Sequence, residues 1–189
     1  MFDARRFNCY LALVVGVAWI SGCVSPEEKE KRQEASTLKL HLQMDFDTGE
    51  KSQLIEVIRA KPTVLRIDKV PFLDESHLVD AAVVDNLGGF AIQVKFDFHG
   101  SLALESASGT HRNKCVAIYC MFTEGRWLGA PQLNQRITDG TLVFTPDATR
   151  EEAERIVRGL NNIAVQMGNK SKTDAPKEAK EKEKAATKP

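Results

Sequence analysis

The chain has 189 residues, and its 26 lysine and arginine residues balance 26 aspartate and glutamate residues, so the formal net charge is zero. This balance gives no support for nucleic-acid binding, which depends on a clustered basic surface. The length is sufficient for one domain with a hydrophobic core, accompanied by flexible ends.

A basic and then apolar segment opens the chain. Arg5 and Arg6 precede a run of apolar residues at 9–20 that is interrupted by a single glycine. This order of a charged region, an apolar region and small residues is typical of a secretory signal peptide. The run is too short to span a membrane comfortably, because a spanning helix needs about 20 apolar residues. We therefore predict that residues 1–22 are a signal peptide.

The four residues at 20–23, Ile-Ser-Gly-Cys, resemble the lipobox of bacterial lipoproteins. In that family a diacylglyceryl group is attached to the cysteine sulfur, and the signal is cut just before the cysteine. The resemblance implies lipidation at Cys23 and a mature chain anchored by lipid in the cell envelope. Val24 and Ser25 stand where some lipoproteins carry an inner-membrane retention aspartate, so the expected location is the outer membrane, facing the periplasm. An ordinary secretory signal or an uncleaved anchor is the alternative.

Both ends of the mature chain are too polar to be buried. Residues 24–36 are mostly charged, and residues 169–189 contain seven lysines, four acidic residues and no large apolar side chain. Such segments cannot offset their conformational entropy by burying apolar surface. We expect a flexible tether at 23–36, a folded domain at 37–167 and a disordered tail at 168–189, with both ends dispensable for folding.

Alternating apolar residues predict a sheet of several strands. In 38–44 every second residue is apolar, which places His41 on the polar, exposed face. Residues 63–68 form a second predicted strand, bracketed by prolines. A double glycine favours a tight hairpin into a strand at 90–98. Residues 115–122 are an apolar run that we predict to be a central strand.

Two short helices and one longer helix are expected. Ser101 is a candidate N-cap for a brief helix through Ala107, and residues 132–137 are a candidate helical turn. Thr149 and Glu152 have the spacing of a capping box, and apolar residues recur at helical spacing after them. The expected fold class is α+β: a mixed or antiparallel sheet, with one long amphipathic helix and one or two short helices packed on one face, flanked by disordered ends.

Three short strings occur in order toward the C-terminus: Gly-Ala-Pro at 129–131, Ile-x-x-Gly at 137–140 and Glu-Glu-Ala at 151–153. With the strands before them, they make residues 62–160 similar to the head portion of the first periplasmic domain of SecD, the accessory subunit of the bacterial protein-export translocase. The resemblance implies the fold of that head and contact with unfolded or extended polypeptide. It does not imply translocation, because that family couples export to a proton gradient through transmembrane helices that we do not expect here.

The sequence offers little for catalysis. It contains no Gly-x-Ser-x-Gly string, no paired-carboxylate signature and no phosphate-binding glycine loop. Cys115 and Cys120 lie five residues apart in one predicted strand, so they point to opposite faces and cannot bridge each other. Two buried thiols are the expected outcome. His99 or His111 would be the base for either thiol, but no motif supports the pairing. Because no zinc-like Cys/His spacing occurs either, we expect no catalysis, no metal and no cofactor.

Three functions remain open at this stage. The first is a lipid-anchored binding or scaffolding protein whose SecD-head-like domain contacts another envelope protein or an exported polypeptide. The second is a structural tether between the outer membrane and the cell wall, and the third is an unrecognised envelope hydrolase or thiol enzyme. For the first, we predict partner contacts at Trp127, Leu128 and Pro131, because loops often carry function and tryptophan is enriched at interfaces. The alternative is that Trp127 fills one end of the core.

Overall fold

The computed structural model describes residue 31 and residues 33–170. The predicted signal peptide, the lipidation site at Cys23 and all but the first three residues of the predicted tail lie outside these described residues. Within them the chain forms nine strands, two α-helices and two short 3-10 helices. In chain order these are β1 Thr37–Leu42, η1 Gly49–Lys51, β2 Ser52–Val57, β3 Thr63–Asp68, β4 Leu73–Asp74, η2 Glu75–His77, β5 Leu78–Asn86, β6 Gly89–Phe96, α3 Phe98–Thr110, β7 Val116–Met121, β8 Gly125–Gly129, β9 Thr141–Phe144 and α4 Arg150–Gln166.

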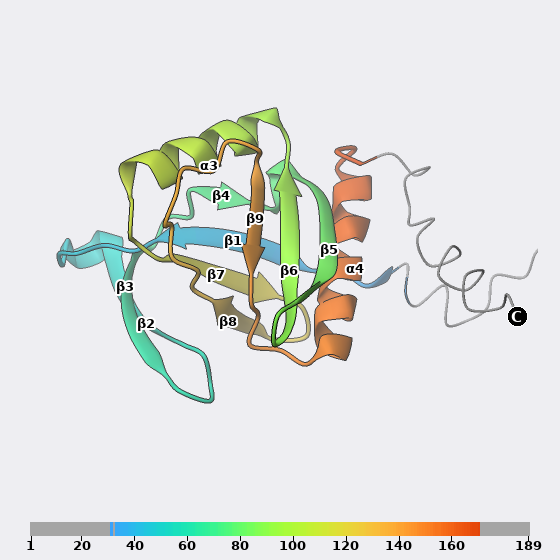
Figure 1. The fold of residues 1–189 in the computed structure, drawn as a ribbon, viewed down its shortest axis with the longest axis horizontal. Helices are drawn as coiled ribbons and strands as arrows, with labels where there is room; N and C mark the ends of the chain where they lie inside the picture. The colour runs from blue at the N-terminus through green and yellow to red at the C-terminus, as the bar shows by residue number, and fades with distance from the viewer. Residues whose placement is uncertain (1–30, 32, 171–189) are drawn as a thin grey trace, which may run out of the picture. The chain divides into compact units, whose positions relative to one another are not determined.

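Antiparallel strands together with two α-helices confirm the predicted α+β class. The strands form three sheets, however, so the expectation of one sheet is wrong. The larger sheets have the orders β4-β1-β7-β8 and β5-β6-β9, and β2 and β3 form a separate hairpin. The two larger sheets cross each other, with β9 and β6 in front of β1 and β7 in Figure 1. A single sheet cannot cover both of its own faces, whereas two crossed sheets enclose a core between them.

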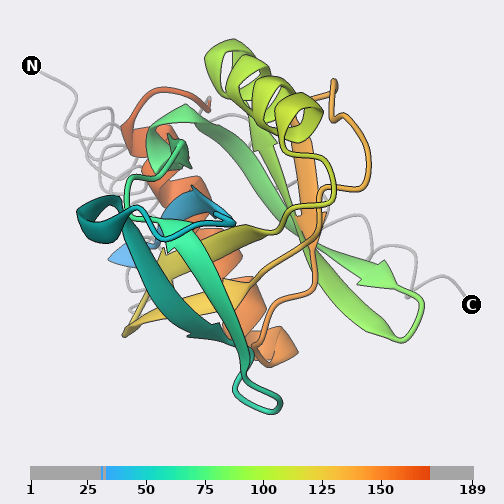
Figure 2. The same ribbon diagram turned by 90° about the vertical axis from the view of Figure 1, so that its left-hand side faces the viewer.

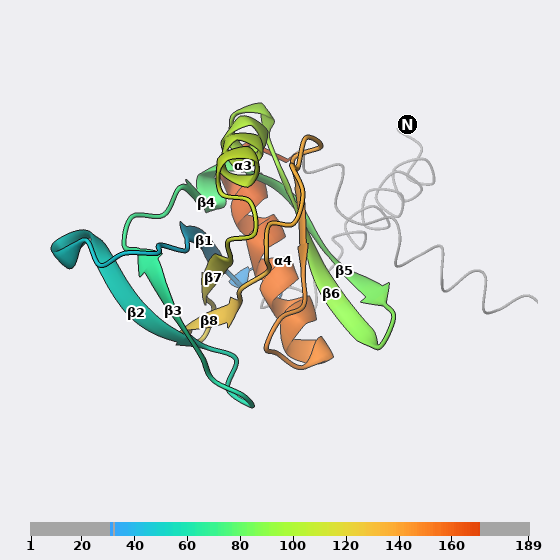
Figure 3. The ribbon, with the colours of Figure 1, turned by 60° about the vertical axis from the view of Figure 1, so that its left-hand side comes forward.

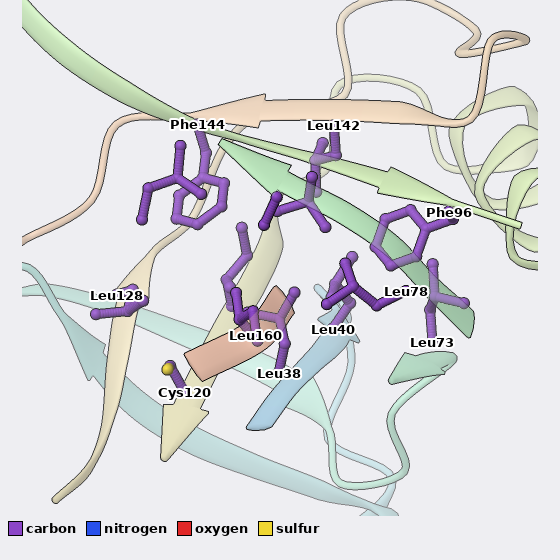
Figure 4. Packing of buried hydrophobic residues seen from close by; sticks show 14 of the residues in the cluster. Leu38, Leu40, Leu73, Leu78, Phe96, Cys120, Leu128, Leu142, Phe144 and Leu160 are labelled. Atoms are coloured by element: carbon purple, nitrogen blue, oxygen red, sulfur yellow. The ribbon is translucent and has the colours of Figure 1, made fainter. Parts of the chain in front are cut away.

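The main core lies between the two larger sheets. Figure 4 shows Leu142 and Phe144 of β9 on one side, facing Leu40 of β1 and Cys120 of β7 on the other. All four side chains are buried, as the alternation along their strands requires. Leu160 of α4 and Leu104 of α3 enter the same cluster, so strands from both sheets and both helices share a single core.

The two helices lie against different sides of this core. Thr149 is the N-cap of α4, since its Oγ1 accepts a hydrogen bond from the Glu152 N–H (3.2 Å), as predicted. Asp97, and not Ser101, caps α3, because its Oδ1 accepts from the Gly100 N–H (2.7 Å). The helices α4 and α3 have 17 and 13 residues, so neither is a minor element. Helix α4 runs alongside β5, and α3 lies across one end of β6 and β9 (Figures 1 and 2). The segment 132–137 is not helical.

The β2–β3 hairpin covers the outer face of the β4-β1-β7-β8 sheet, as Figure 3 shows. Beneath it lies a second, smaller core to which Ile55, Ile67 and Trp127 contribute. His41 is buried in this layer, with 6 % of its surface exposed, and its Nδ1 lies 2.8 Å from the Asp68 carbonyl oxygen. The expectation of an exposed His41 is therefore wrong. Burial also lowers the pKa of this imidazole.

The hairpin is also fastened at its far end. The backbone N–H and Nε of Arg59, in the β2–β3 turn, both donate to Asp147 Oδ2, at 2.9 and 3.0 Å. The Asp147 N–H in turn donates to the Leu128 carbonyl oxygen of β8 (2.6 Å). One carboxylate residue thus ties the hairpin turn to the edge of the sheet that the hairpin covers.

The folded unit is wider than the predicted 37–167. The Glu34 carboxylate accepts hydrogen bonds from Arg155 Nε (3.0 Å) and Arg158 Nη1 (2.7 Å) of α4. Ser36 is fully buried beside Gly159, where an added Cβ would lie 2.3 Å from the Ser36 Oγ. At the other end, the Asn169 side chain donates to the carbonyl oxygens of residues 76 and 78. The predicted tether therefore does not extend to residue 36, and the predicted tail does not begin at 168.

Candidate functional site

A groove runs along the free edge of β9. This strand pairs with β6 on one side only, and the connection from β8 passes beside its other edge (Figure 1). The space between them has a volume of about 720 Å³. We call it the β9 groove, and its lining residues are Pro131, Gln132, Leu133, Asn134, Gln135, Arg136, Ile137, Thr138, Asp139, Thr141, Leu142 and Val143.

The first part of the groove wall is held by the sheet. The Val116 N–H donates to the Pro131 carbonyl oxygen (2.9 Å), and the Leu133 N–H donates to the Lys114 carbonyl oxygen (2.8 Å). The Leu133 carbonyl oxygen accepts from the Asn113 N–H (2.8 Å), and the Leu133 side chain is buried. These bonds continue the ladder between β7 and β8, so the wall is anchored where it leaves the sheet.

The second part of the wall is held by α3. The buried Ser108 Oγ accepts a hydrogen bond from the Ile137 N–H (2.9 Å) and donates to the Glu105 carbonyl oxygen (3.1 Å). The Glu105 carboxylate also pairs with Arg136 Nη2 at 2.7 Å. Because the wall is fastened at both ends, the groove is formed before any ligand arrives.

Gly140 turns the chain from the wall into β9. Its φ is +66°, a conformation that residues with a Cβ rarely adopt. A Cβ there would also lie 1.9 Å from the Ser101 Oγ of α3. The Gly-Ala-Pro and Ile-x-x-Gly strings that carry the SecD resemblance therefore supply both ends of the wall of the β9 groove, through Pro131, Ile137 and Gly140.

The edge of β9 offers unused hydrogen-bonding groups to the groove. Leu142 is opposite Val94 in β6, and the Phe96 N–H donates to the Gly140 carbonyl oxygen (3.0 Å). In an antiparallel pair alternate residues bond across the ladder, so Gly140 and Leu142 direct their backbone groups toward β6, and Val143 directs its own toward the groove. The Val143 N–H and C=O have no partner among the described residues.

The groove carries little charge of its own. Among its lining residues only Arg136 and Asp139 are charged, and both are engaged: Arg136 with Glu105, and Asp139 Oδ1 with the Thr141 N–H (3.1 Å). The remaining polar side chains are amides and hydroxyls, and the apolar ones include Leu133 and Leu142. Such a lining suits an uncharged ligand with hydrogen-bonding groups.

The three predicted partner residues do not lie together. Trp127 and Leu128 belong to β8 and not to an irregular connection, and Leu128 is in the main core with 1 % of its surface exposed. The Trp127 ring is half-buried, edge-on to Tyr119 (5.1 Å between centroids) and His41 (5.3 Å), which supports the alternative that it fills a core. Pro131 alone lines the groove. A partner contact at Trp127 stays a prediction.

Of the predicted contact residues only Pro131 lines the groove, so sequence reasoning missed the other lining residues, Val143 among them. The Val143 side chain is 48 % exposed on a strand of four residues between the Asp139-Gly140 turn and Pro146. A short strand bounded by a turn and a proline is a signal of an edge position, because proline cannot continue a central ladder. That signal was available in the sequence.

The cysteine and histidine candidates have different surroundings. Cys120 borders a second cavity of about 280 Å³, beside the ion pair of Arg126 and Glu152 (2.5 Å). Its thiol is buried, and burial raises its pKa to about 12; burial also raises the pKa of Cys115. His99 lies near His77 instead, with ring centroids 6.4 Å apart. Within residues 33–170 no group of three or more His, Cys, Asp or Glu side chains is placed to hold a metal.

The described helices give no membrane span, since none within residues 33–170 is both long and apolar enough to cross a bilayer. No protein-family profile matches the chain, and no curated protein sequence matches it either.

Solved structures of SecDF share the fold. One, of a membrane component SecDF that enhances protein export, aligns with a TM-score of 0.50 and 18 % identity over 75 % of this chain and 70 % of that chain. A second, of SecDF in a super-membrane-facing form, aligns with a TM-score of 0.52 and 17 % identity, over 74 % of this chain but only 21 % of that one. At this level of identity the likeness concerns the fold, and for the fold it confirms the predicted resemblance to SecD.

Proposed function

We propose that the chain is a lipid-anchored protein of the bacterial cell envelope whose domain binds an extended segment of another polypeptide, without catalysing a reaction. The observation that carries this proposal is the β9 groove, a preformed slot with unused backbone groups along one wall. A related structure is that of a membrane component that enhances protein export, which supports an exported polypeptide as the ligand.

The chemistry of the described residues supports binding over catalysis. A thiol attacks as the thiolate, and a buried thiol with a raised pKa is protonated at neutral pH. Cys120 is such a thiol, with 1 % of its surface exposed. The groove itself is lined by amides, hydroxyls, apolar groups and two charged side chains, Arg136 and Asp139, that already have partners.

Lipidation at Cys23 is the first prediction from this proposal. We expect cells grown with a radioactive fatty acid to label the wild-type chain and to leave Cys23→Ala unlabelled, because the thioether to the diacylglyceryl group needs the cysteine sulfur. Cys120→Ala is the matched control and should be labelled like the wild type. Equal labelling of wild type and Cys23→Ala would contradict lipid attachment at this residue.

The groove is tested by photocrosslinking in cells. A photoreactive amino acid at Asn134, an exposed lining residue, should crosslink to other polypeptides. The same amino acid at Leu87, the fully exposed tip of the β5–β6 turn, serves as the control and should give few crosslinks. An excess of a reduced, unfolded polypeptide added to membrane extracts should compete for the Asn134 crosslinks. Equal crosslinking from both positions, or none from Asn134, would exclude the groove as the binding site.

A further inference from the structure

We infer that the ligand binds in the β9 groove as an added β-strand, paired through its backbone with the free edge of β9. This inference rests on the proposed function and specifies its ligand class: an extended, uncharged segment that is recognised by its main chain. It also assigns Val143 as the residue that pairs with the ligand.

The first support is the backbone of β9 itself. The N–H and C=O of Val143 point into the groove and have no partner among the described residues. An extended strand supplies a matching acceptor and donor at the ladder spacing of about 4.8 Å. Next along the edge, the Thr141 N–H is already bound by Asp139 Oδ1, which limits the ladder in that direction.

The other end of the edge is limited by β8. A Cβ on Gly129 would lie 3.0 Å from the Thr145 carbonyl oxygen, so β8 and the end of β9 are in close approach there. The open part of the edge is therefore short and centred on Val143. An added strand would pair over a few residues only, which predicts weak and reversible binding.

The second support is the opposite wall. Asn134 and Gln135 are exposed amide residues of the connection, and amides both donate and accept hydrogen bonds. The Gln132 amide is already engaged, because its Nε2 donates to the Asn113 carbonyl oxygen (2.9 Å). The partly buried Ile137 and the exposed Val143 add apolar surface to the same groove. A strand between these walls would turn alternate side chains in opposite directions, one set toward the domain and the other toward solvent.

The third support is the charge of the groove. Its two charged residues, Arg136 and Asp139, have opposite signs, and each already has a partner. The groove therefore neither attracts nor repels a charged ligand strongly. A ligand chosen by its backbone and not by its charge fits this lining better than an acidic or basic peptide does.

The test uses the full chain and a fluorescent ten-residue peptide of alternating valine and threonine with one lysine at each end. Fluorescence anisotropy should show binding to the wild type, which offers the Val143 N–H to the peptide, and Leu87→Ala, at the exposed tip of the β5–β6 turn, should bind within about twofold of it. Val143→Pro removes that N–H and should weaken binding about tenfold or more. The fold should persist in Val143→Pro, because β6 does not use this N–H and proline is tolerated on strand edges.

A modified peptide provides a readout that does not depend on the folding of any variant. The same peptide with N-methyl groups on alternate residues cannot complete a ladder, and it should bind the wild type about tenfold or more weakly. If Val143→Pro unfolds, as a thermal melt would show, this comparison decides alone. If the methylated peptide binds as well as the unmodified one, strand addition is wrong although binding to the groove stands. If the unmodified peptide does not bind the wild type, the proposed binding of extended polypeptide fails as well.

Discussion

Trp127→Ala should lower the free energy of unfolding by about 3 kcal/mol. This value is at the low end of the range for replacing a core aromatic residue by alanine, because the Trp127 ring is only half-buried. The ring packs in the core beneath the β2–β3 hairpin, with Ile55 and Ile67 in the same cluster. It also makes edge-on contacts with His41 and Tyr119, which are worth more than their buried area alone. Urea denaturation followed by circular dichroism measures this loss.

Trp127→Phe is the matched control for this substitution. It keeps an aromatic ring in the cluster and should cost less than about 1.5 kcal/mol. The competing hypothesis is that Trp127 contacts a partner. An alanine variant with unchanged stability and weakened crosslinking through Asn134 would support that hypothesis and contradict the core role.

A chain that begins at Thr37 should be less stable than a chain that begins at Gln33 by about 2 kcal/mol. The shorter chain lacks Glu34, whose carboxylate accepts two charge-assisted hydrogen bonds from α4. Bonds of this kind contribute about 1.5–3 kcal/mol each when buried, and we reduce the sum because Arg155 is 55 % exposed. The free energies come from urea denaturation of the two purified chains.

The dependence of this difference on pH identifies its source. Burial alone would raise the pKa of Glu34, but the hydrogen bonds from Arg155 and Arg158 outweigh it and lower the pKa from 4.5. A lowered pKa in the folded state stabilises the fold above pH 4.5, and this stabilisation is lost as the pH falls through the folded-state pKa. The gap between the two chains should therefore be widest near neutral pH and narrow in acid.

The matched control for this pair is a chain that begins at Cys23. It should be as stable as the chain that begins at Gln33, because we expect the residues before Gln33 to be a tether that is dispensable for folding. A gap that widens as the pH falls would contradict the role of the Glu34 carboxylate. Equal stability of the Gln33 and Thr37 chains would show that the contacts of residues 33–36 contribute nothing.

Local patterns in the sequence predicted single elements well. The prolines around 63–68 bracket β3, which has those bounds, and the double glycine marks the β5–β6 turn. The capping-box spacing gave the start of α4 at Thr149. In each case the signal lies within a few residues of the element that it specifies, so tertiary contacts are not needed to interpret it.

Predictions from the sequence were wrong where a segment distant in the chain determines the surroundings of a residue. Period-two alternation in β1 identified the two faces of the strand but could not show that the β2–β3 hairpin covers the second one, and His41 was therefore misplaced. Trp127 was placed in a loop because β8 has only five residues and carries a glycine at each end. Its strand character comes from pairing with Tyr119 of β7.

The β9 groove could be predicted only in part. Pro131 was among the predicted contacts, and the Asp139-Gly140 turn was visible in the sequence. The shape of the groove depends on the bond between Ile137 and Ser108, residues 29 positions apart that belong to a loop and a helix. No local pattern encodes such a contact, so the wall could not be placed beside β9 without the structure.

The position of β1 has a consequence for how the domain folds. This strand is central in its sheet, yet its main partner is β7, so that Leu40 pairs with Ile118. The segment before it is held by Arg155 and Arg158, near the other end of the domain. Proteins in which contacting residues are far apart in the sequence fold slowly, because the chain loses loop-closure entropy before the stabilising contacts form. In a chain that is synthesised or exported N-terminus first, more than 70 residues must follow β1 before its partner β7 is available. During this time the backbone groups of β1 that will pair with β7 are exposed, and they need protection from aggregation.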